Sequence, residues 1–441
     1  MKKVLVLGAG LVSGPHVRYL LDVPDFEVTV ASRTVSKAEA LINGHPRGRA
    51  IALDVNDEAA LGALIRQADL AVSMLPYVYH PKVAALCVRY QKHMVTTSYV
   101  KEAMRALDGP AKEAGVILLN EIGVDPGIDH MSAMRVIHRV ERHGGRIASF
   151  VSWTGGLPAP EASDNPFGYK FSWTPRGALL AAKNAARYQQ DSQIVEFPGE
   201  ELFDHCWPVR IEGLGDFEGF PNRDSLPYMD TYGIRPTGWM FRGTLRNVGW
   251  CTTLKKIVEM GLLDETPLPD RPATFREFTA RILGVSPDAD LAQTLAGRWG
   301  MSLDVKPITD LAWLGLFGDD PLPAGKNTPI DILAARMASK MAYKPGECDM
   351  LVMQHEFVAE YPDRKEAITA TMIDYGVPNG DTSMARTVGL PAAIAVEMIL
   401  HGRFAGLTGV HVPVIPEIYE PVLAKLAELG IGLNETVKII A

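Results

Sequence analysis

The stretch Val4-Leu5-Val6-Leu7-Gly8-Ala9-Gly10-Leu11-Val12-Ser13-Gly14 decides the fold of the chain. An apolar run of strand length enters a glycine turn and continues as a helix-like pattern. Gly8 suits a tight turn and Gly10 lets backbone approach a phosphate, because glycine has no side chain. Ser13 takes the third place of Gly-x-Gly-x-x-Gly. The stretch predicts a dinucleotide cradle, and the alternative is a glycine turn without a ligand.

Strands and helices alternate after this turn. The further expected strands are Phe26–Ala31, Arg49–Leu53, a run from Asp69 that stops at Pro76, His93–Thr97 and Val116–Leu119. Six strands spaced by helices predict a parallel Rossmann sheet. Such sheets bind ligands beyond the carboxyl ends of their strands, so we expect the functional side chains there.

The second strand ends in Ser32-Arg33-Thr34, without the acidic residue that binds a ribose 2′-hydroxyl in NAD-specific folds. A hydroxyl and a guanidinium suit a 2′-phosphate, which favours NADP(H) as the cofactor. A solvated arginine is the alternative. Asp54, at the end of the third strand, either touches the adenine side of the cofactor or caps the next helix.

Two strand ends carry side chains that could face a nicotinamide ring. Tyr99 follows the fifth strand, and Asp125 follows the sixth. A phenol or a carboxylate placed there can move a proton while hydride moves to or from the cofactor. The alternative for Asp125 is an Asx turn before Pro126-Gly127.

From Ile147 the pattern changes to strands joined by loops rich in glycine and proline. These loops and strands carry Lys170, Arg176, Arg223, Arg242 and Arg246. Arginine suits bidentate capture of carboxylates, so the group fits a substrate with several acidic groups. A surface ion pair is the alternative for each of these residues taken singly.

The sequence predicts an α/β protein with an N-terminal Rossmann domain, a mixed α+β substrate and dimerisation domain, and a helical insertion. Residues 1–130 form the Rossmann domain, which about 383–441 complete through an apolar helix from Ser383 to His401. Residues 131–250 and 342–382 form the mixed domain, in which strands Asp349–Phe357 and Glu366–Met372 pair with those after Ile147. Residues 251–341 form the helical region.

Composition narrows the classes of function. The chain has 441 residues, 47% hydrophobic and 22% charged, and a net charge of −8, which argues against a nucleic-acid-binding surface. Its four cysteines form no CxxC pair, its histidines lack metal-ligand spacing, and we expect no metal. The apolar run before Gly8 is too short for a signal peptide, and no run suggests a membrane span. We therefore expect a cytoplasmic enzyme.

Longer motifs add a resemblance to a known family. They are Gly8–Val12, Leu53–Asp57, Thr96–Val100, Asn120–His130, Gly155–Glu161, Asp164–Pro166 and Gly168–Trp173. The chain resembles the saccharopine reductases, the glutamate-forming, NADP-dependent saccharopine dehydrogenases of lysine metabolism. The resemblance implies oxidation of saccharopine at its C–N bond and hydrolysis of the imine, giving glutamate and 2-aminoadipate 6-semialdehyde. It also implies a homodimer.

The resemblance implies roles for individual residues. Proton handling would belong to Asp125 and Tyr99. Contacts with the amino-acid substrate would come from Ser98, Tyr99, Asp125, Arg223, Thr244, Leu245 and Arg246. Contacts with NADP(H) would come from Gly8, Gly10, Leu11, Val12, Ser13, Ser32, Arg33, Thr34, Asp54, Val55, Leu75, Val124, Pro126 and Thr174. Fungal members carry a cysteine in the strand before Gly155, where this chain has Thr154.

Two other functions remain open at this point. One is a related imine reductase for another pair of amine and aldehyde, such as a carboxylated-polyamine dehydrogenase. The other is a non-catalytic NADP-binding scaffold, which Asp125 and the arginines disfavour.

Overall fold

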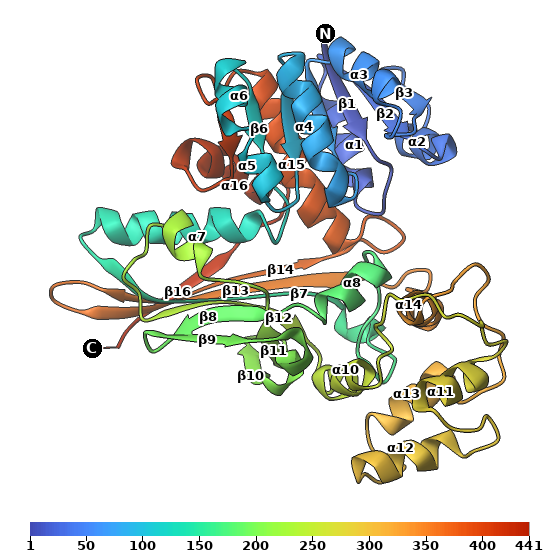
Figure 1. Ribbon diagram of the computed structural model, residues 1–441. Coiled ribbons are helices and arrows are strands. Elements are labelled where there is room, and N and C mark those ends of the chain that lie inside the picture. Colours follow the sequence, from blue (N-terminus) through green and yellow to red (C-terminus); the bar gives the residue numbers. More distant parts are fainter. Residues whose placement is uncertain (441) are drawn as a thin grey trace. The chain divides into compact units, whose positions relative to one another are not determined.

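Two compact units make up the computed structural model, which describes residues 1–440. Unit 1 contains residues 1–146, 359–365 and 370–436. Unit 2 contains residues 147–358, 366–369 and the C-terminal residues from 437. Figure 1 shows the helices and strands of both units.

Unit 1 holds a parallel sheet of seven strands. The strands are β1 (Lys2–Leu7), β2 (Phe26–Ser32), β3 (Gly48–Ala52), β4 (Leu70–Ser73), β5 (His93–Thr96), β6 (Ile117–Leu119) and β15 (Gly409–His411). Their order is β15-β6-β5-β4-β1-β2-β3, with every neighbouring pair parallel. The six predicted strands are confirmed. The order reverses between β1 and β4, which is where doubly wound sheets bind their ligands.

Helices connect these strands. They are α1 (Ser13–Asp22), α2 (Val35–Ile42), α3 (Glu58–Gln67), α4 (His80–Arg89), α5 (Glu102–Arg105), α6 (Asp108–Glu113), α7 (Ile128–Arg142), α15 (Ser383–Leu400) and α16 (Pro416–Glu428). Strand β1 is buried without interruption from Val4 to Leu7, the pattern expected for a parallel strand covered on both faces.

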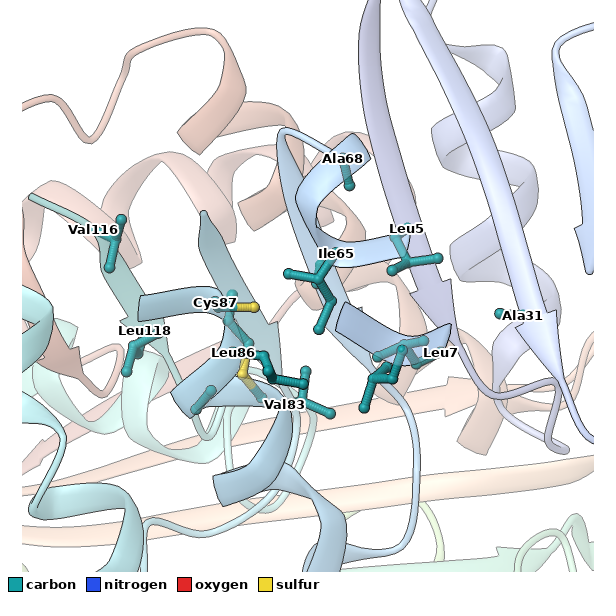
Figure 2. Close-up of a cluster of buried hydrophobic side chains, with 14 of the residues drawn as sticks. Leu5, Leu7, Ala31, Ile65, Ala68, Val83, Leu86, Cys87, Val116 and Leu118 are labelled. Carbon is teal, nitrogen blue, oxygen red and sulfur yellow. The ribbon is translucent and has the colours of Figure 1, made fainter. Parts of the chain in front are cut away.

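A cluster of buried apolar side chains joins this sheet to α3 and α4 (Figure 2). Leu5 and Leu7 of β1 belong to it, while Val4 and Val6 point to the opposite face, because side chains alternate along a strand. The two helices contribute residues at helical spacing, Leu61 and Ile65 from α3 and Val83, Leu86 and Cys87 from α4. The cluster therefore positions the start of α4 next to the ends of β4 and β5.

Helix α15 packs on α1, so a segment near the C-terminus completes the Rossmann unit (Figure 1). A Cβ atom on Gly389 would lie 2.9 Å from the Val12 carbonyl oxygen, which makes the approach of the two helices very close. By length and composition α15 could cross a membrane, contrary to our expectation that no segment would qualify. However, 67% of that window is buried within the protein, which is typical of a core helix.

The second sheet has nine strands. They are β7 (Arg146–Pro158), β8 (Ala186–Gln190), β9 (Gln193–Phe197), β10 (Trp207–Ile211), β11 (Gly215–Pro221), β12 (Trp239–Arg246), β13 (Asp349–Glu360), β14 (Lys365–Tyr375) and β16 (Asn434–Ile439). The main path is β10-β11-β12-β7-β13-β14-β16, and β12 runs parallel to β7 but antiparallel to β11. Of the two strands expected to pair with those after Ile147, β13 lies next to β7 as expected, whereas β14 lies between β13 and β16.

Helices of unit 2 lie mainly between β12 and β13. They are α8 (Pro175–Ala181), α9 (Pro227–Thr231), α10 (Trp250–Glu259), α11 (Phe275–Leu283), α12 (Leu291–Trp299), α13 (Ile308–Leu314) and α14 (Pro329–Lys340). The last five occupy the predicted helical region. The chain thus leaves the sheet after β12, forms a block of helices and returns to the sheet at β13.

His16 provides a pH-dependent element in the contact between α1 and α15. Its ring is fully buried, and Nδ1 lies 3.0 Å from the Gly389 carbonyl oxygen. Burial lowers the pKa of His16 from 6.5 to about 4. Between these values the unfolded chain takes up a proton at this residue and the folded chain does not. The neutral ring therefore contributes stability that is complete above pH 6.5 and is lost as the pH falls.

We expect His16→Leu to flatten the pH dependence of the unfolding free energy between pH 6.5 and 4. The substitution removes one histidine contribution, which has a maximum slope of about 1.4 kcal/mol per pH unit. Denaturant unfolding at several pH values measures how steeply the unfolding free energy depends on pH in the parent and in the variant. Equal slopes for the variant and the parent would contradict this role of His16.

Candidate active site

The glycine turn between β1 and α1 has the form of a phosphate cradle. Gly8 adopts φ +111°, and a Cβ atom there would lie 2.8 Å from the Met74 carbonyl oxygen. A Cβ on Gly10 would meet no atom within 4 Å, which leaves open space over the turn. The buried Ser13 hydroxyl accepts the Gly10 N–H at 3.1 Å. The backbone thus requires glycine at position 8, while position 10 keeps open space over the turn for a ligand.

Backbone donors in this turn are available for a ligand. Within residues 1–440, no carbonyl or side chain accepts from the N–H groups of Leu11 and Val12, which directly precede helix α1. Unsatisfied N–H groups at a helix N-terminus favour a phosphate. The residues present therefore fit the pyrophosphate of a dinucleotide.

The end of β2 presents the group expected to bind a 2′-phosphate. Arg33 is exposed, and its guanidinium makes no hydrogen bond or ion pair with residues 1–440. Ser32 accepts the Thr34 N–H at 3.3 Å through its hydroxyl oxygen and so keeps its own proton for donation. A free guanidinium beside free hydroxyl donors suits a phosphate dianion.

The neighbouring strand ends carry the other predicted cofactor residues of unit 1. Asp54 accepts the backbone and side-chain N–H groups of Asn56 at 2.9 and 3.0 Å. Asp54 does not cap the next helix, because Asp57 does so by accepting the Ala60 N–H. Val55 and Leu75 pack at the rim of the apolar cluster, half-buried.

The Tyr99 hydroxyl donates a hydrogen bond to Asp125 Oδ1 at 2.9 Å. Both side chains are half-buried and follow the ends of β5 and β6. Asp125 lies in a tight turn in which Gly123 N–H donates to the Pro126 carbonyl at 2.9 Å. Gly127 has φ +148°, and a Cβ atom there would lie 2.0 Å from the Gly123 carbonyl oxygen. The turn thus requires glycine at position 127.

Glu121 holds the two proton-handling segments together, and sequence reasoning missed it. Its carboxylate accepts the Val100 N–H at 2.7 Å and lies 2.8 Å from Nε2 of His130. Glu121 is 6% exposed and His130 is fully buried. The loop of Tyr99 is therefore tied to helix α7, whose first residues follow Asp125. The signal in the sequence was a carboxylate two residues after the end of β6.

Two of the five basic residues singled out in unit 2 are committed to structural ion pairs, which corrects our interpretation of the group. Lys170 is 2% exposed, and its ammonium lies 2.8 Å from Asp164 and 2.6 Å from Glu347. Arg176 pairs with Glu265 at 2.6 Å and with Asp331 at 3.0 Å. The ion-pair alternative holds for both, since their charges are already neutralised.

Arg246 differs from that pair. Its side chain is 8% exposed, lies over the rings of Tyr169 and Trp250, and donates from Nη1 to the Leu245 carbonyl at 2.7 Å. Its Nε is buried without a partner in residues 1–440, and no carboxylate of unit 2 pairs with it. A buried cation that lacks an anion is costly unless a ligand supplies one. This guanidinium therefore suits a ligand carboxylate.

The remaining predicted residues of unit 2 lie in different settings. Thr244 is half-buried and lies opposite Thr154 in the parallel pair of β12 and β7. Thr154, which replaces the cysteine of the fungal members, is therefore a neighbour of a predicted substrate-binding residue. Leu245 is fully buried, which leaves only its backbone for a ligand. Arg223 adopts φ +59° after β11. Thr174 is exposed at the start of α8.

Val124 and Pro126 flank Asp125 and are both buried. Val124 accepts the Asp129 N–H at 3.1 Å through its carbonyl, so it supports the turn as well as any contact with cofactor. In residues 1–440 no group of three or more histidine, cysteine, aspartate and glutamate side chains could hold a metal ion.

Comparison with known proteins agrees with the resemblance in the sequence. The family model "Saccharopine dehydrogenase NADP binding domain" matches residues 4–119, and "Saccharopine dehydrogenase C-terminal domain" matches residues 123–431. The saccharopine dehydrogenase (NADP(+), L-glutamate-forming) of Schizosaccharomyces pombe is 43% identical over 99% of both chains. The enzyme of that name from Saccharomyces cerevisiae is 40% identical over 98% of this chain and 99% of its own.

A solved structure extends the agreement to the fold. The apo histidine-tagged saccharopine dehydrogenase (L-Glu forming) from Saccharomyces cerevisiae superposes with a TM-score of 0.90, 39% identity and 100% coverage of both chains. The mitochondrial alpha-aminoadipic semialdehyde synthase of Bos taurus is 38% identical over 98% of this chain, which matches 47% of that longer protein.

We expect Arg33→Ala to raise the KM for NADP(H) by about tenfold to a hundredfold, the value of a charge-assisted hydrogen bond, with little change for NAD(H). Steady-state kinetics measure the KM of the variant and of the parent for NADP(H) and for NAD(H). The control is Arg49→Ala, which removes an exposed arginine from the neighbouring strand β3. An equal loss with both cofactors would contradict recognition of the 2′-phosphate by Arg33.

Proposed function

Because the chain belongs to the saccharopine dehydrogenase family, we propose that it converts saccharopine, NADP+ and water into L-glutamate, 2-aminoadipate 6-semialdehyde and NADPH, reversibly and within lysine metabolism. The observation that carries the proposal is the 43% identity to the Schizosaccharomyces pombe enzyme over 99% of both chains. The residues described above supply chemistry that fits this reaction.

Unit 1 would hold the cofactor through the glycine turn and the end of β2. The free N–H groups of Leu11 and Val12 suit the pyrophosphate, and Arg33 suits the 2′-phosphate. Bound NADP+ supplies a hydride acceptor. The chain itself binds and orients the reactants and moves protons.

Asp125 is the proposed base and acid. The secondary amine of saccharopine must lose its proton before hydride can leave the adjacent carbon, and a carboxylate can accept that proton. Water then adds to the resulting imine. When the carbinolamine collapses, the departing nitrogen of glutamate needs a proton, which the same carboxyl group can return. The hydrogen bond from Tyr99, 2.9 Å long, orients the Asp125 carboxylate for these steps.

Arg246 supports a substrate with carboxylates. Its buried guanidinium has aromatic rings on its faces and no carboxylate partner in unit 2. Saccharopine carries three carboxylates, and a planar guanidinium forms charge-assisted hydrogen bonds with such a group. A carboxylated polyamine shares this feature, so the choice between the two substrates rests on turnover rather than on Arg246.

We expect Asp125→Asn to lower kcat for saccharopine oxidation by about a hundredfold or more, because the amide cannot accept the amine proton. Tyr99→Phe, which removes the hydroxyl that orients Asp125, should have a smaller effect. NADPH absorbance measures turnover with saccharopine and, in parallel, with a carboxylated polyamine.

The control for this experiment is Glu113→Gln, which changes an exposed carboxylate at the end of α6. Cofactor binding, measured by NADPH fluorescence, should be equal in all variants. A parent protein that binds NADPH but turns over neither amine would overturn the proposed function in favour of a binding scaffold. Preferential turnover of the polyamine would favour the related imine reductase.

We also propose that two copies associate, as the family resemblance implies. The support is an apolar groove over the second sheet, lined among others by Val151, Trp153, Tyr188, Trp207, Phe241 and Phe357. Half-buried Trp207 and Trp239 give this groove accessible aromatic surface, and aromatic residues are enriched at protein interfaces.

We expect the 48.1-kDa chain to sediment at twice its mass, and Trp207→Arg to shift it towards the monomer, because the charge cannot be buried in an apolar contact. Analytical ultracentrifugation checks both masses. A parent protein that stays monomeric at micromolar concentration would contradict the association.

A further inference from the structure

A buried histidine connects the ends of two strands beside the site. His80 is the first residue of α4 and is 4% exposed. Its Nδ1 lies 2.8 Å from Oγ of Ser73, the last residue of β4. Its Nε2 lies 2.8 Å from Oγ of Ser98, which follows β5. The imidazole therefore spans two hydroxyl groups.

The charge state of His80 follows from its surroundings. Burial lowers the pKa of His80 from 6.5 to about 4. The ring is thus neutral near pH 7, with one nitrogen that donates a hydrogen bond and one that accepts. The direction of both hydrogen bonds depends on which nitrogen carries the proton.

Thr96 decides between the two tautomers. Its hydroxyl donates to the Ser73 carbonyl at 2.9 Å, so its lone pairs remain, and its oxygen lies 3.4 Å from His80 Nε2. If Nε2 carried no proton, its lone pair would face the lone pairs of the Thr96 oxygen and the two would repel each other. If Nε2 carries the proton, the N–H group is attracted to that oxygen. The proton therefore sits on Nε2. Nε2–H donates to Ser98, and the Ser73 hydroxyl donates to Nδ1.

In this arrangement the Ser98 hydroxyl accepts a hydrogen bond from His80, so its own proton remains available for donation. Among residues 1–440, the Ser98 hydroxyl has only His80 as a hydrogen-bond partner, and that bond uses an oxygen lone pair. The other tautomer would take up the Ser98 proton and leave the hydroxyl an acceptor. Since Ser98 is half-buried at the strand ends, its available proton suits an oxygen of a bound molecule.

We propose that His80 is a positioning residue that fixes the Ser98 hydroxyl as a hydrogen-bond donor to a carboxylate oxygen of the amino-acid substrate. The proposal rests on the proposed function, since the substrate is the one named there. His80 is itself only 4% exposed. It acts through Ser98, while Ser73 holds the tautomer.

Replacing His80 by glutamine or by asparagine distinguishes a residue that positions Ser98 from one that only supports the fold. The side-chain amide of His80→Gln reaches the place of Nε2 and can donate to Ser98. His80→Asn reaches only the place of Nδ1 and keeps the contact with Ser73. We expect both Ser98→Ala and His80→Asn to raise the saccharopine KM by about tenfold, and we expect His80→Gln to have a KM close to that of the parent. Neither should change the KM for NADP+ appreciably.

A double-mutant cycle completes the test. In the Ser98→Ala background, His80→Asn should cause no further rise in the saccharopine KM, because its effect passes through the missing hydroxyl. Ser73→Ala removes the hydroxyl that donates to Nδ1 and leaves His80 in place. It should raise the saccharopine KM a few-fold in the parent and should not raise it further in the Ser98→Ala background. The Ser73→Ala variant also tests the proposal if His80→Asn proves unstable. His93→Asn, at the amino end of β5, is the matched control.

The outcomes are distinguishable. A His80→Asn variant with the parent KM, a His80→Gln variant equal to His80→Asn, or additive effects with Ser98→Ala would overturn the proposal. A rise confined to the KM for NADP+ would show that Ser98 donates to an oxygen of the cofactor, and would overturn it too. Failure of the proposed function differs from all of these, because the parent protein would then not oxidise saccharopine.

Discussion

The close approach of β1 and β4 at Gly8 is the constraint on which the active-site half of the molecule depends. The turn after β1 has a positive φ and no room for a side chain, because the Met74 carbonyl oxygen would lie 2.8 Å from a Cβ atom. This lets the chain leave the sheet at the point where its strand order reverses. The free N–H groups of the turn, Arg33 after β2 and the pair of Tyr99 and Asp125 all follow strand ends on that one edge of the sheet. A larger residue at position 8 would push the cradle away from β4.

A second constraint is the satisfaction of buried polar groups around that edge. Glu121, His130, His80 and Ser73 are all buried, and each has a hydrogen-bond partner among the others or in the nearby loops. An unmet polar group in such a place would cost on the order of 1–3 kcal/mol. The network therefore holds the loop of Ser98 and Tyr99 in one conformation before any ligand arrives.

Much of this was predictable from the sequence, for local physical reasons. Apolar runs bounded by turn residues identified the six strands, since a strand covered on both faces has to be apolar throughout. The strand-end rule then pointed to Arg33, Tyr99 and Asp125 from order alone. What could not be predicted depends on distant partners. The charge of Lys170 is neutralised by Glu347, 177 positions away, and the proposed role of His80 exists only because three hydroxyl groups at the ends of two strands surround it. Strand β15 is as short as β6, but only Gly409 of its three residues is buried, so no apolar run marks it in the sequence.

The packing of α15 on α1 has a consequence for synthesis of the protein. The partner of α1 lies in residues 383–400, so the ribosome must translate almost the whole chain before the first helix can be covered. Nearly all of unit 2 emerges in the meantime and has its own sheet and helices to form. Until then the side of α1 that packs on α15, and the parts of β4 and β5 that α15 contacts, stay open to water, and a chaperone would have the most apolar surface to bind at this stage.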